Sequence, residues 1–303
     1  MDQKDFETEL AMSLIENQLY DEALSYLNRL IDKYPENKLL LFLKGKILYI
    51  TGLFQESIEV LTTIIANQTD YWQAYELLGE VYRTLNQSGL AETFYSKATE
   101  INPQAMSSWL GRGKMAYQQC EFQIATLCFE TYLRSDMKNI EIRLLLARSY
   151  REMDNYLSAI DAFNETIDID PTNQEIYEEL GDLYVKLDHP EIAREKYSQA
   201  LQVEEKTRPV NKEIYYKLIE LVFKEENYQK AFNLCNELLT IVKSDPKALF
   251  LSGKALIKLN DIKEGRKRIS EAYDLEKNDE YWKYLEKFDD NRLREKIKSR
   301  NYE

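Results

Sequence analysis

Few residues in this chain interrupt a helix. Of its 303 residues only 9 are glycine and 6 are proline, and these two residue types most often end helices and form tight turns. Their scarcity leaves little material for β-hairpins and favours long helices. The 22 tyrosines and 11 phenylalanines supply apolar volume for a core, although 31% of the residues are charged. The composition therefore predicts a mainly helical protein.

Side chains with catalytic chemistry are equally scarce. The one histidine, His189, precedes Pro190, and no serine or cysteine is placed to use it as a general base. The three cysteines, Cys120, Cys128 and Cys235, lack the spacing of metal ligands, which indicates inert thiols in a reducing compartment. We expect no enzyme activity, no metal site and no cofactor.

Long apolar runs are absent as well. The N-terminal residues 1–5 are polar with no apolar run behind them, and no stretch approaches the roughly 18 apolar residues needed to span a bilayer. We therefore expect no signal peptide, no membrane insertion and a cytoplasmic location. The net charge of −13 argues against binding nucleic acid through its phosphates.

Charge is distributed unevenly along the chain. From Pro246 to the C-terminus the sequence contains 15 basic and 12 acidic residues, in contrast to the acidic remainder. Its densest basic run extends from Lys263 to Arg268. This run is interpreted either as a solvated helix face or as a contact for an acidic partner or a membrane surface.

Small residues recur at a fixed interval. Gly45, Gly79 and Gly113 are 34 residues apart, and Gly181 follows at twice that distance. A second series has the same spacing: Ala23, Ser57, Ala91, Ala125, Ala159 and Ala193. A period of this length indicates one small structural unit copied along the chain. Stacked repeats usually form binding surfaces rather than reaction centres.

Large residues surround these small ones in a constant pattern. In the best-formed copies, Tyr75-x2-Leu78-Gly79-x2-Tyr82 recurs as Tyr177-x2-Leu180-Gly181-x2-Tyr184. Large side chains at i, i+3 and i+7 form one apolar stripe on a helix, and the glycine at i+4 leaves a gap in it. A second helix fits this gap through its own small residue, and an aromatic four residues later closes the joint.

This spacing resembles the tetratricopeptide repeat, in which two antiparallel helices occupy 34 residues. Extending the register divides the chain into eight repeats: 4–37, 38–71, 72–105, 106–139, 140–173, 174–207, 212–245 and 246–279. Fifteen of the sixteen positions where the two helices of a repeat cross hold a small residue, and the exception is Ile219. Turns within repeats are expected at Gly52, Ser88-Gly89, Asp154-Asn155, Asp188-His189-Pro190 and Asn260-Asp261.

The resemblance implies an all-α, right-handed α-solenoid of about eight helix pairs with a C-terminal capping helix. Repeats one to six occupy residues 1–207, and repeats seven and eight occupy 212–279. Four inserted residues, 208–211, separate them and mark the expected boundary between two sub-stacks. Residues 280–303 form the expected cap, whose apolar stripe comprises Tyr281, Leu285, Phe288, Leu293 and Ile297.

The resemblance also implies where a partner binds. Members of this family generally bind peptides or partner helices on a concave face, into which the fifth and ninth residues of each repeat point. Carried onto this chain, these positions give Phe42 and Lys46, Leu110 and Lys114, Leu144 and Arg148, and Phe250 and Lys254. One helical turn further on, the lining is extended by Tyr49, Arg83, Tyr117 and Arg151.

Other repeats hold acidic residues at the same two positions: Glu76 and Glu80, Glu178 and Asp182, and Glu220 beside Tyr216. An alternative interpretation is that the apolar side chains pack against the next repeat while the charged ones are solvated. Family members that clamp the C-terminal tails of chaperones use asparagines at the sixth and ninth positions. No asparagine occupies these positions here, so a heat-shock co-chaperone function is not expected.

The sequence therefore predicts a protein–protein interaction scaffold or adaptor. Its partner would be a protein or peptide segment, apolar on one side and acidic on another, that lies in the groove of repeats two to five. The alternative is a chaperone or assembly factor for a subunit of a membrane-attached machine such as a flagellum or pilus.

Overall fold

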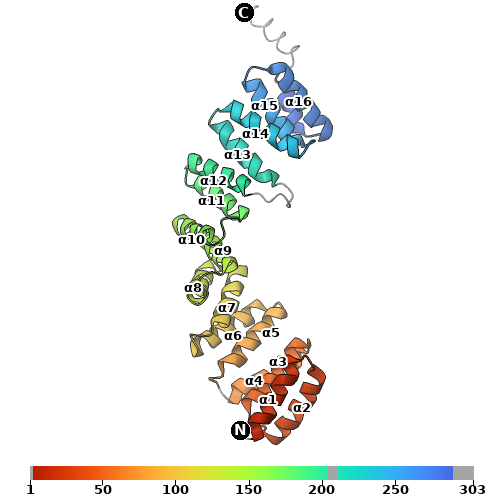
Figure 1. The fold of residues 1–303 in the computed structure, drawn as a ribbon, viewed down its shortest axis with the longest axis vertical. Coiled ribbons are helices and arrows are strands. Elements are labelled where there is room, and N and C mark those ends of the chain that lie inside the picture. Colours follow the sequence, from red (N-terminus) through yellow and green to blue (C-terminus); the bar gives the residue numbers. More distant parts are fainter. Residues whose placement is uncertain (1–2, 68, 204–210, 289–303) are drawn as a thin grey trace, which may run out of the picture. The chain divides into compact units, whose positions relative to one another are not determined.

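A computed structural model describes residues 3–67, 69–203 and 211–288 of the chain, and within them the regular secondary structure is entirely α-helical. Figure 1 shows these helices following one another in sequence order. The all-α class predicted from the sequence is confirmed. Each of the eight predicted 34-residue segments contains two helices within its described part.

The helices of the first five predicted repeats are α1 (Gln3–Glu16), α2 (Tyr20–Lys33), α3 (Lys38–Ile50), α4 (Phe54–Asn67), α5 (Trp72–Thr84), α6 (Ser88–Ile101), α7 (Met106–Gln118), α8 (Phe122–Leu133), α9 (Ile140–Glu152) and α10 (Tyr156–Ile169). They are followed by α11 (Gln174–Lys186), α12 (Pro190–Gln202), α13 (Lys212–Lys224), α14 (Tyr228–Ile241), α15 (Pro246–Lys258), α16 (Ile262–Leu275) and α17 (Asp279–Glu286).

The chain divides into two compact bodies, an N-terminal body of residues 1–162 and a C-terminal body of residues 163–303. The division lies within α10, not at the insertion 208–211 where the sequence placed a boundary. Residues 208–210 lie outside the described part of the chain, so a joint at that position stays a prediction.

One residue in each turn between paired helices has a positive φ: Gln18, Gly52, Asn86, Cys120, Asp154, Asp188, Glu226 and Asn260. Successive members are 34 residues apart, except where the four-residue insertion lengthens the interval. This left-handed conformation reverses the chain in few residues, and it favours glycine or asparagine because a Cβ is strained there. The turn predicted at Ser88-Gly89 was wrong, because Ser88 already begins α6 and the turn residue is Asn86.

The joint between paired helices has the predicted construction. A Cβ added to Gly79 of α5 would lie 2.8 Å from the ring of Tyr95 in α6. Both Tyr95 and the preceding small residue Ala91 are fully buried. Glycine is therefore required at this crossing because the aromatic ring of the second helix occupies the space of a side chain.

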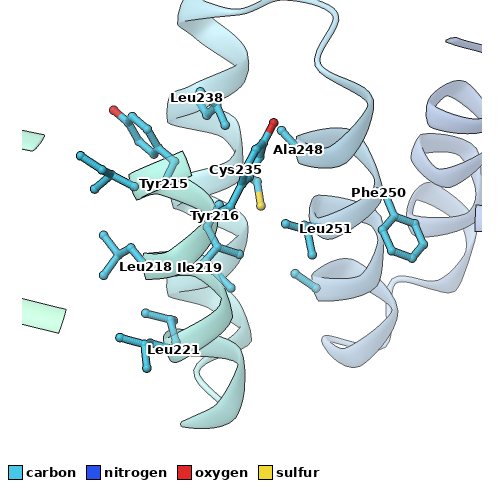
Figure 2. Close-up of a cluster of buried hydrophobic side chains, with 14 of the residues drawn as sticks. Tyr215, Tyr216, Leu218, Ile219, Leu221, Cys235, Leu238, Ala248, Phe250 and Leu251 are labelled. Atoms are coloured by element: carbon cyan, nitrogen blue, oxygen red, sulfur yellow. The ribbon is translucent and has the colours of Figure 1, made fainter. Parts of the chain in front are cut away.

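One continuous apolar core joins α11 to α17 in the C-terminal body. Figure 2 shows Ile219 of α13 within this core, near Cys235 of α14 and Leu251 of α15. The predicted stripe of the cap is confirmed as far as it is described. Tyr281 of α17 stacks on Phe250 at a centroid distance of 4.3 Å, and Leu285 and Phe288 also contact the core. Leu293 and Ile297 lie outside the described residues.

Candidate functional site

The predicted groove residues of α3 combine aromatic surface with one exposed cation. Phe42 is half-buried with its ring edge-on to Tyr71, 5.7 Å between centroids. Lys46 is exposed and forms no ion pair with any carboxylate in the described part of the chain. The hydroxyl oxygen of Tyr49 lies 3.4 Å from Oγ1 of Thr84 in α5, which places neighbouring first helices side by side.

On α5 the predicted residue Arg83 is not free. Its Nη2 donates to Oε2 of Glu80 at 2.7 Å, and the hydroxyl of Tyr95 donates to Oε1 of the same carboxylate at 2.5 Å. The hydrogen bond to Glu80 raises the pKa of Arg83. Burial, followed by its hydrogen bond to Glu80, raises the pKa of Tyr95. The carboxylate of Glu80 therefore has two partners within its own repeat, Arg83 and Tyr95.

The next first helix, α7, presents Leu110, Lys114 and Tyr117. Leu110 and Tyr117 are half-buried and pack on the core of α7, α8 and α9. Nζ of Lys114 forms an ion pair with Oε1 of Glu141 in α9 at 2.7 Å. The cation expected to meet a partner therefore has a carboxylate of the same chain beside it, although the pair is exposed.

On α9 the predicted residues Leu144, Arg148 and Arg151 are all half-buried. Arg151 forms an ion pair with Glu152 at 2.9 Å. Between α5 and α7, Glu76 is half-buried. Burial raises its pKa, and the nearby hydroxyl of Ser107 in α7 opposes that shift. Contacts thus link α3 to α5, α5 to α7 and α7 to α9 on the side that holds the predicted residues.

The carboxylates of Glu178 and Asp182 in α11 of the C-terminal body also have partners within the chain. Nζ of Lys217 in α13 lies 2.8 Å from Oε1 of Glu178 and 2.8 Å from Oδ2 of Asp182. The hydroxyl of Tyr197 donates to Asp182 at 2.6 Å. Nδ2 of Asn211, in the inserted segment, donates to Glu178 at 3.0 Å.

A hollow of about 490 Å³ lies among α13, α15 and the start of α17. We call it the lysine hollow, and its basic and aromatic lining consists of Phe223, Lys224, Lys247, Phe250, Lys254 and Tyr281. In Figure 2, Phe250 extends from the side of α15 opposite Leu251. Two carboxylates, Glu220 and Glu280, also lie at its lining.

Aromatic rings lie near two of the three ammonium groups of the lysine hollow. Nζ of Lys247 lies 4.1 Å from the ring centroid of Tyr216. Nζ of Lys254 lies 5.2 to 5.8 Å from the centroids of Phe250, Tyr284 and Phe223. Such contacts hold a cation in place without neutralising it.

The sequence pointed to part of the lysine hollow and missed the rest. Phe250 and Lys254 occupy the fifth and ninth positions of the eighth repeat and were expected in a groove. Lys247 and Phe223 are at neither position, and Tyr281 comes from the cap helix. No repeat-based pattern identifies these three, because they belong to three different elements that meet only at the end of the stack.

The basic run on α16 is largely paired within the chain. Arg268 donates to Oδ1 of Asn236 at 2.6 Å and lies near Oε1 of Glu264 at 3.7 Å. Lys267 lies 3.9 Å from Oε2 of Glu264. Lys267 is thus exposed, whereas Arg268 is half-buried.

Two features are absent from the described residues. They contain no group of three or more histidine, cysteine, aspartate or glutamate side chains arranged to hold a metal ion. None of the described helices combines the length and apolarity needed to cross a bilayer.

Sequence models of the tetratricopeptide repeat match residues 8–71, 73–105, 140–173 and 178–248, which is most of the chain. The chain belongs to the tetratricopeptide repeat family. The resemblance noted in the sequence is thereby confirmed.

Two curated proteins are similar to this chain. The TPR repeat-containing protein YpiA of Bacillus subtilis (strain 168) is 21% identical over 234 residues, covering 77% of this chain and 54% of YpiA. The BBSome complex member BBS4 homolog of Drosophila melanogaster is 27% identical over 188 residues, covering 62% of this chain and 34% of that protein. The chain thus spans about half and about a third of the lengths of these relatives.

Solved structures share the fold. The structure titled Naa15/Naa10 bound to HypK-THB matches with a TM-score of 0.69 and 13% identity over 91% of this chain and 42% of that one. The C-terminal part of a TPR repeat-containing protein from Cytophaga hutchinsonii matches with a TM-score of 0.60 and 17% identity over 80% of this chain and 98% of that one. At such identities the similarity concerns the fold alone.

Proposed function

We propose that this tetratricopeptide protein, a protein–protein interaction scaffold by family, binds a segment of a partner protein along α3, α5, α7 and α9 of its N-terminal body. The observation that carries the proposal is the chain of contacts between these first helices: Tyr49 lies against Thr84, α5 packs directly against α7, and Lys114 pairs with Glu141. Helices linked in this way offer a continuous surface on which a peptide can lie.

The residues of this surface define the partner's chemistry. Phe42, Leu110 and Tyr117 are half-buried and leave apolar surface exposed, which suits an apolar side chain of the partner. Lys46 offers a cation with no carboxylate of the described chain beside it. A segment with apolar side chains on one side and carboxylates on the other complements both features.

Each exposed charge contact contributes no more than about 1 kcal/mol, so the test combines three substitutions. The variant Lys46→Glu/Lys114→Glu/Arg148→Glu is compared with Lys263→Glu/Arg266→Glu/Lys267→Glu, which reverses the same number of charges on α16. Affinity purification with quantitative mass spectrometry is followed by binding measurements on the purified partner. We expect the first variant to lose the partner and the second to keep it, with circular dichroism unchanged in both. Retention of the partner by the first variant would refute the proposal.

The same experiment separates a scaffold from the alternative of a chaperone or assembly factor. One partner at constant stoichiometry supports the scaffold, whereas several unstable clients support the assembly factor. The Drosophila relative is described as a member of a complex, which favours a scaffold within an assembly. We further propose that the protein works without catalysis and in the cytoplasm.

A further inference from the structure

We propose that the lysine hollow of the C-terminal body is a second binding site, which takes an acidic segment of a partner protein with an apolar side chain between its carboxylates. This site shares no residue with the surface on α3 to α9 and goes beyond the function proposed for it. The protein would then hold two segments at two places along one chain.

The charges of the lysine hollow are unusual for this chain. The sequence contains 53 acidic and 40 basic residues, so a lysine has many carboxylates available. Lys114 and Lys217 have carboxylate oxygens at 2.7 and 2.8 Å. By contrast, Lys224, Lys247 and Lys254 form no ion pair with a carboxylate of the described residues. With Glu220 and Glu280 in the same lining, these three lysines leave the hollow net positive within an acidic chain, and this balance favours an anionic ligand.

Aromatic rings restrain the side chains of Lys247 and Lys254 before a ligand binds. A flexible lysine side chain loses rotamer freedom when it contacts a ligand, and this loss weakens binding. Contact with Tyr216 restrains Lys247, and three rings restrain Lys254 before any ligand arrives. The rings leave the ammonium charges in place, so part of the ordering cost is removed in advance.

The shape of the hollow favours a peptide with an apolar centre. Its volume of about 490 Å³ accommodates a few side chains and not a folded domain. Phe223, Phe250 and Leu251 provide the aliphatic and phenylalanine part of the lining. An apolar side chain in this position would bury hydrophobic area while flanking carboxylates reach the ammonium groups.

The two carboxylates at the hollow select against long polyanions. Glu220 and Glu280 lie in the same lining as the lysines, and the whole chain has a net charge of −13. A nucleic acid or an anionic bilayer brings negative charge against all of these groups at once, whereas a short acidic peptide places its carboxylates only near the lysines. An acidic protein segment is therefore the favoured occupant.

The test uses the full chain and a fluorescein-labelled hexapeptide of sequence EELWDD, with binding followed by fluorescence anisotropy. We expect saturable binding that weakens as salt is raised. The variant Lys247→Glu/Lys254→Glu should weaken binding at least tenfold. The matched variant Lys263→Glu/Lys267→Glu reverses two charges on α16 and should change the affinity by less than twofold. Both variants alter side chains with solvent access, and circular dichroism and thermal unfolding establish that they remain folded.

Five results would overturn the inference. The first four are the absence of saturable binding, equal binding of the neutral peptide QQLWNN, an equal loss in both variants, and cosedimentation of the chain with phosphatidylserine vesicles when EELWDD does not bind. Loss of EELWDD binding in the variant Lys46→Glu/Lys114→Glu/Arg148→Glu, but not in Lys247→Glu/Lys254→Glu, would also refute it. That last result would place the peptide on the N-terminal surface and support the function proposed there.

Discussion

Gly253 of α15 and Gly265 of α16 face each other so closely that a Cβ on either would lie 2.7 Å from the carbonyl oxygen of the other. Both residues are buried. Side chains of Ile269 and Ile257 lie slightly closer, at 2.5 and 2.6 Å, but because backbone oxygens also lie in the way, rotating a side chain does not make room for a methyl group. At this crossing both helices contribute a glycine.

Gly265→Ala should therefore destabilise the protein. The methyl group forces α15 and α16 apart, and overpacking of this kind costs roughly 1–3 kcal/mol. Gly89→Ala is the matched control, because a Cβ on Gly89 of α6 would meet nothing within 4 Å. This control should stabilise by up to about 1 kcal/mol through helix propensity. Urea unfolding measures both, and equal effects would contradict the close crossing.

The turn residues with positive φ allow a substitution that should stabilise the protein instead of destabilising it. Glu226 has a φ of 58°, a conformation that costs a residue with a Cβ roughly 1–2 kcal/mol. Glu226→Gly should stabilise the protein by about 0.5–1 kcal/mol once the greater freedom of unfolded glycine is subtracted. Gly52→Ala, at a φ of 81°, should destabilise by a similar amount. If the midpoint temperature of thermal unfolding shifts in the same direction for both variants, this account of the turns is refuted.

The environment of Asp245 predicts that the stability of the protein depends on pH. It is buried, and its Oδ1 accepts hydrogen bonds from the hydroxyl of Tyr216 at 2.6 Å and from the N–H of Ala248 at 2.8 Å. Its Oδ2 accepts from Lys212 at 2.8 Å. Burial alone would raise the pKa of Asp245, but these hydrogen bonds outweigh it and hold the pKa below its ordinary value.

A carboxyl whose pKa is depressed by folding stabilises the native state above its unfolded pKa, and this contribution disappears as the pH falls through the folded pKa. Asp245→Asn keeps a capping oxygen and loses the charge, so it should destabilise by about 1–3 kcal/mol at pH 7. The difference from wild type should shrink below about pH 4. Urea unfolding at several pH values tests this, and a constant difference down to pH 2 would rule it out.

The joint within the fifth repeat provides a fourth test. Ala159 is fully buried at the position where α10 approaches α9 in the predicted register. Ala159→Leu forces bulk into that joint and should cost roughly 1–3 kcal/mol. Because repeats are stabilised by neighbouring interfaces, the loss should appear locally. Hydrogen exchange should speed up around repeats four to six, and uniform weakening along the chain would count against the register.

The sequence predicted the helix pairs well, because two helix backbones that cross closely require small residues at the crossing. Position 79 must be glycine because the ring of Tyr95 crosses it. The 34-residue period of small residues can therefore be read directly from the sequence. Turn positions were harder, because Asn86, Cys120 and Glu226 adopt one conformation with three unrelated side chains. A misplaced turn at Ser88-Gly89 resulted.

Charge pairing was the least predictable part of the candidate site. Whether Lys114 reaches Glu141 depends on the distance between neighbouring first helices, and Lys217 spans two carboxylates of another repeat. Spacing within one repeat contains no information about such contacts. The lysine hollow was partly missed for the same reason, since α17 contributes to it without belonging to a repeat.

The turn between α7 and α8 gives the molecule a natural attachment point for a spectroscopic probe. Cys120 is exposed in that turn, whereas Cys128 and Cys235 are fully buried. Burial raises the pKa of each buried thiol to about 12, so neither forms the reactive thiolate near neutral pH. A maleimide dye or spin label should therefore attach at one position in the native protein without mutagenesis. Its signal would report on partner binding to the N-terminal body, because α7 and its neighbours present the surface proposed to bind there.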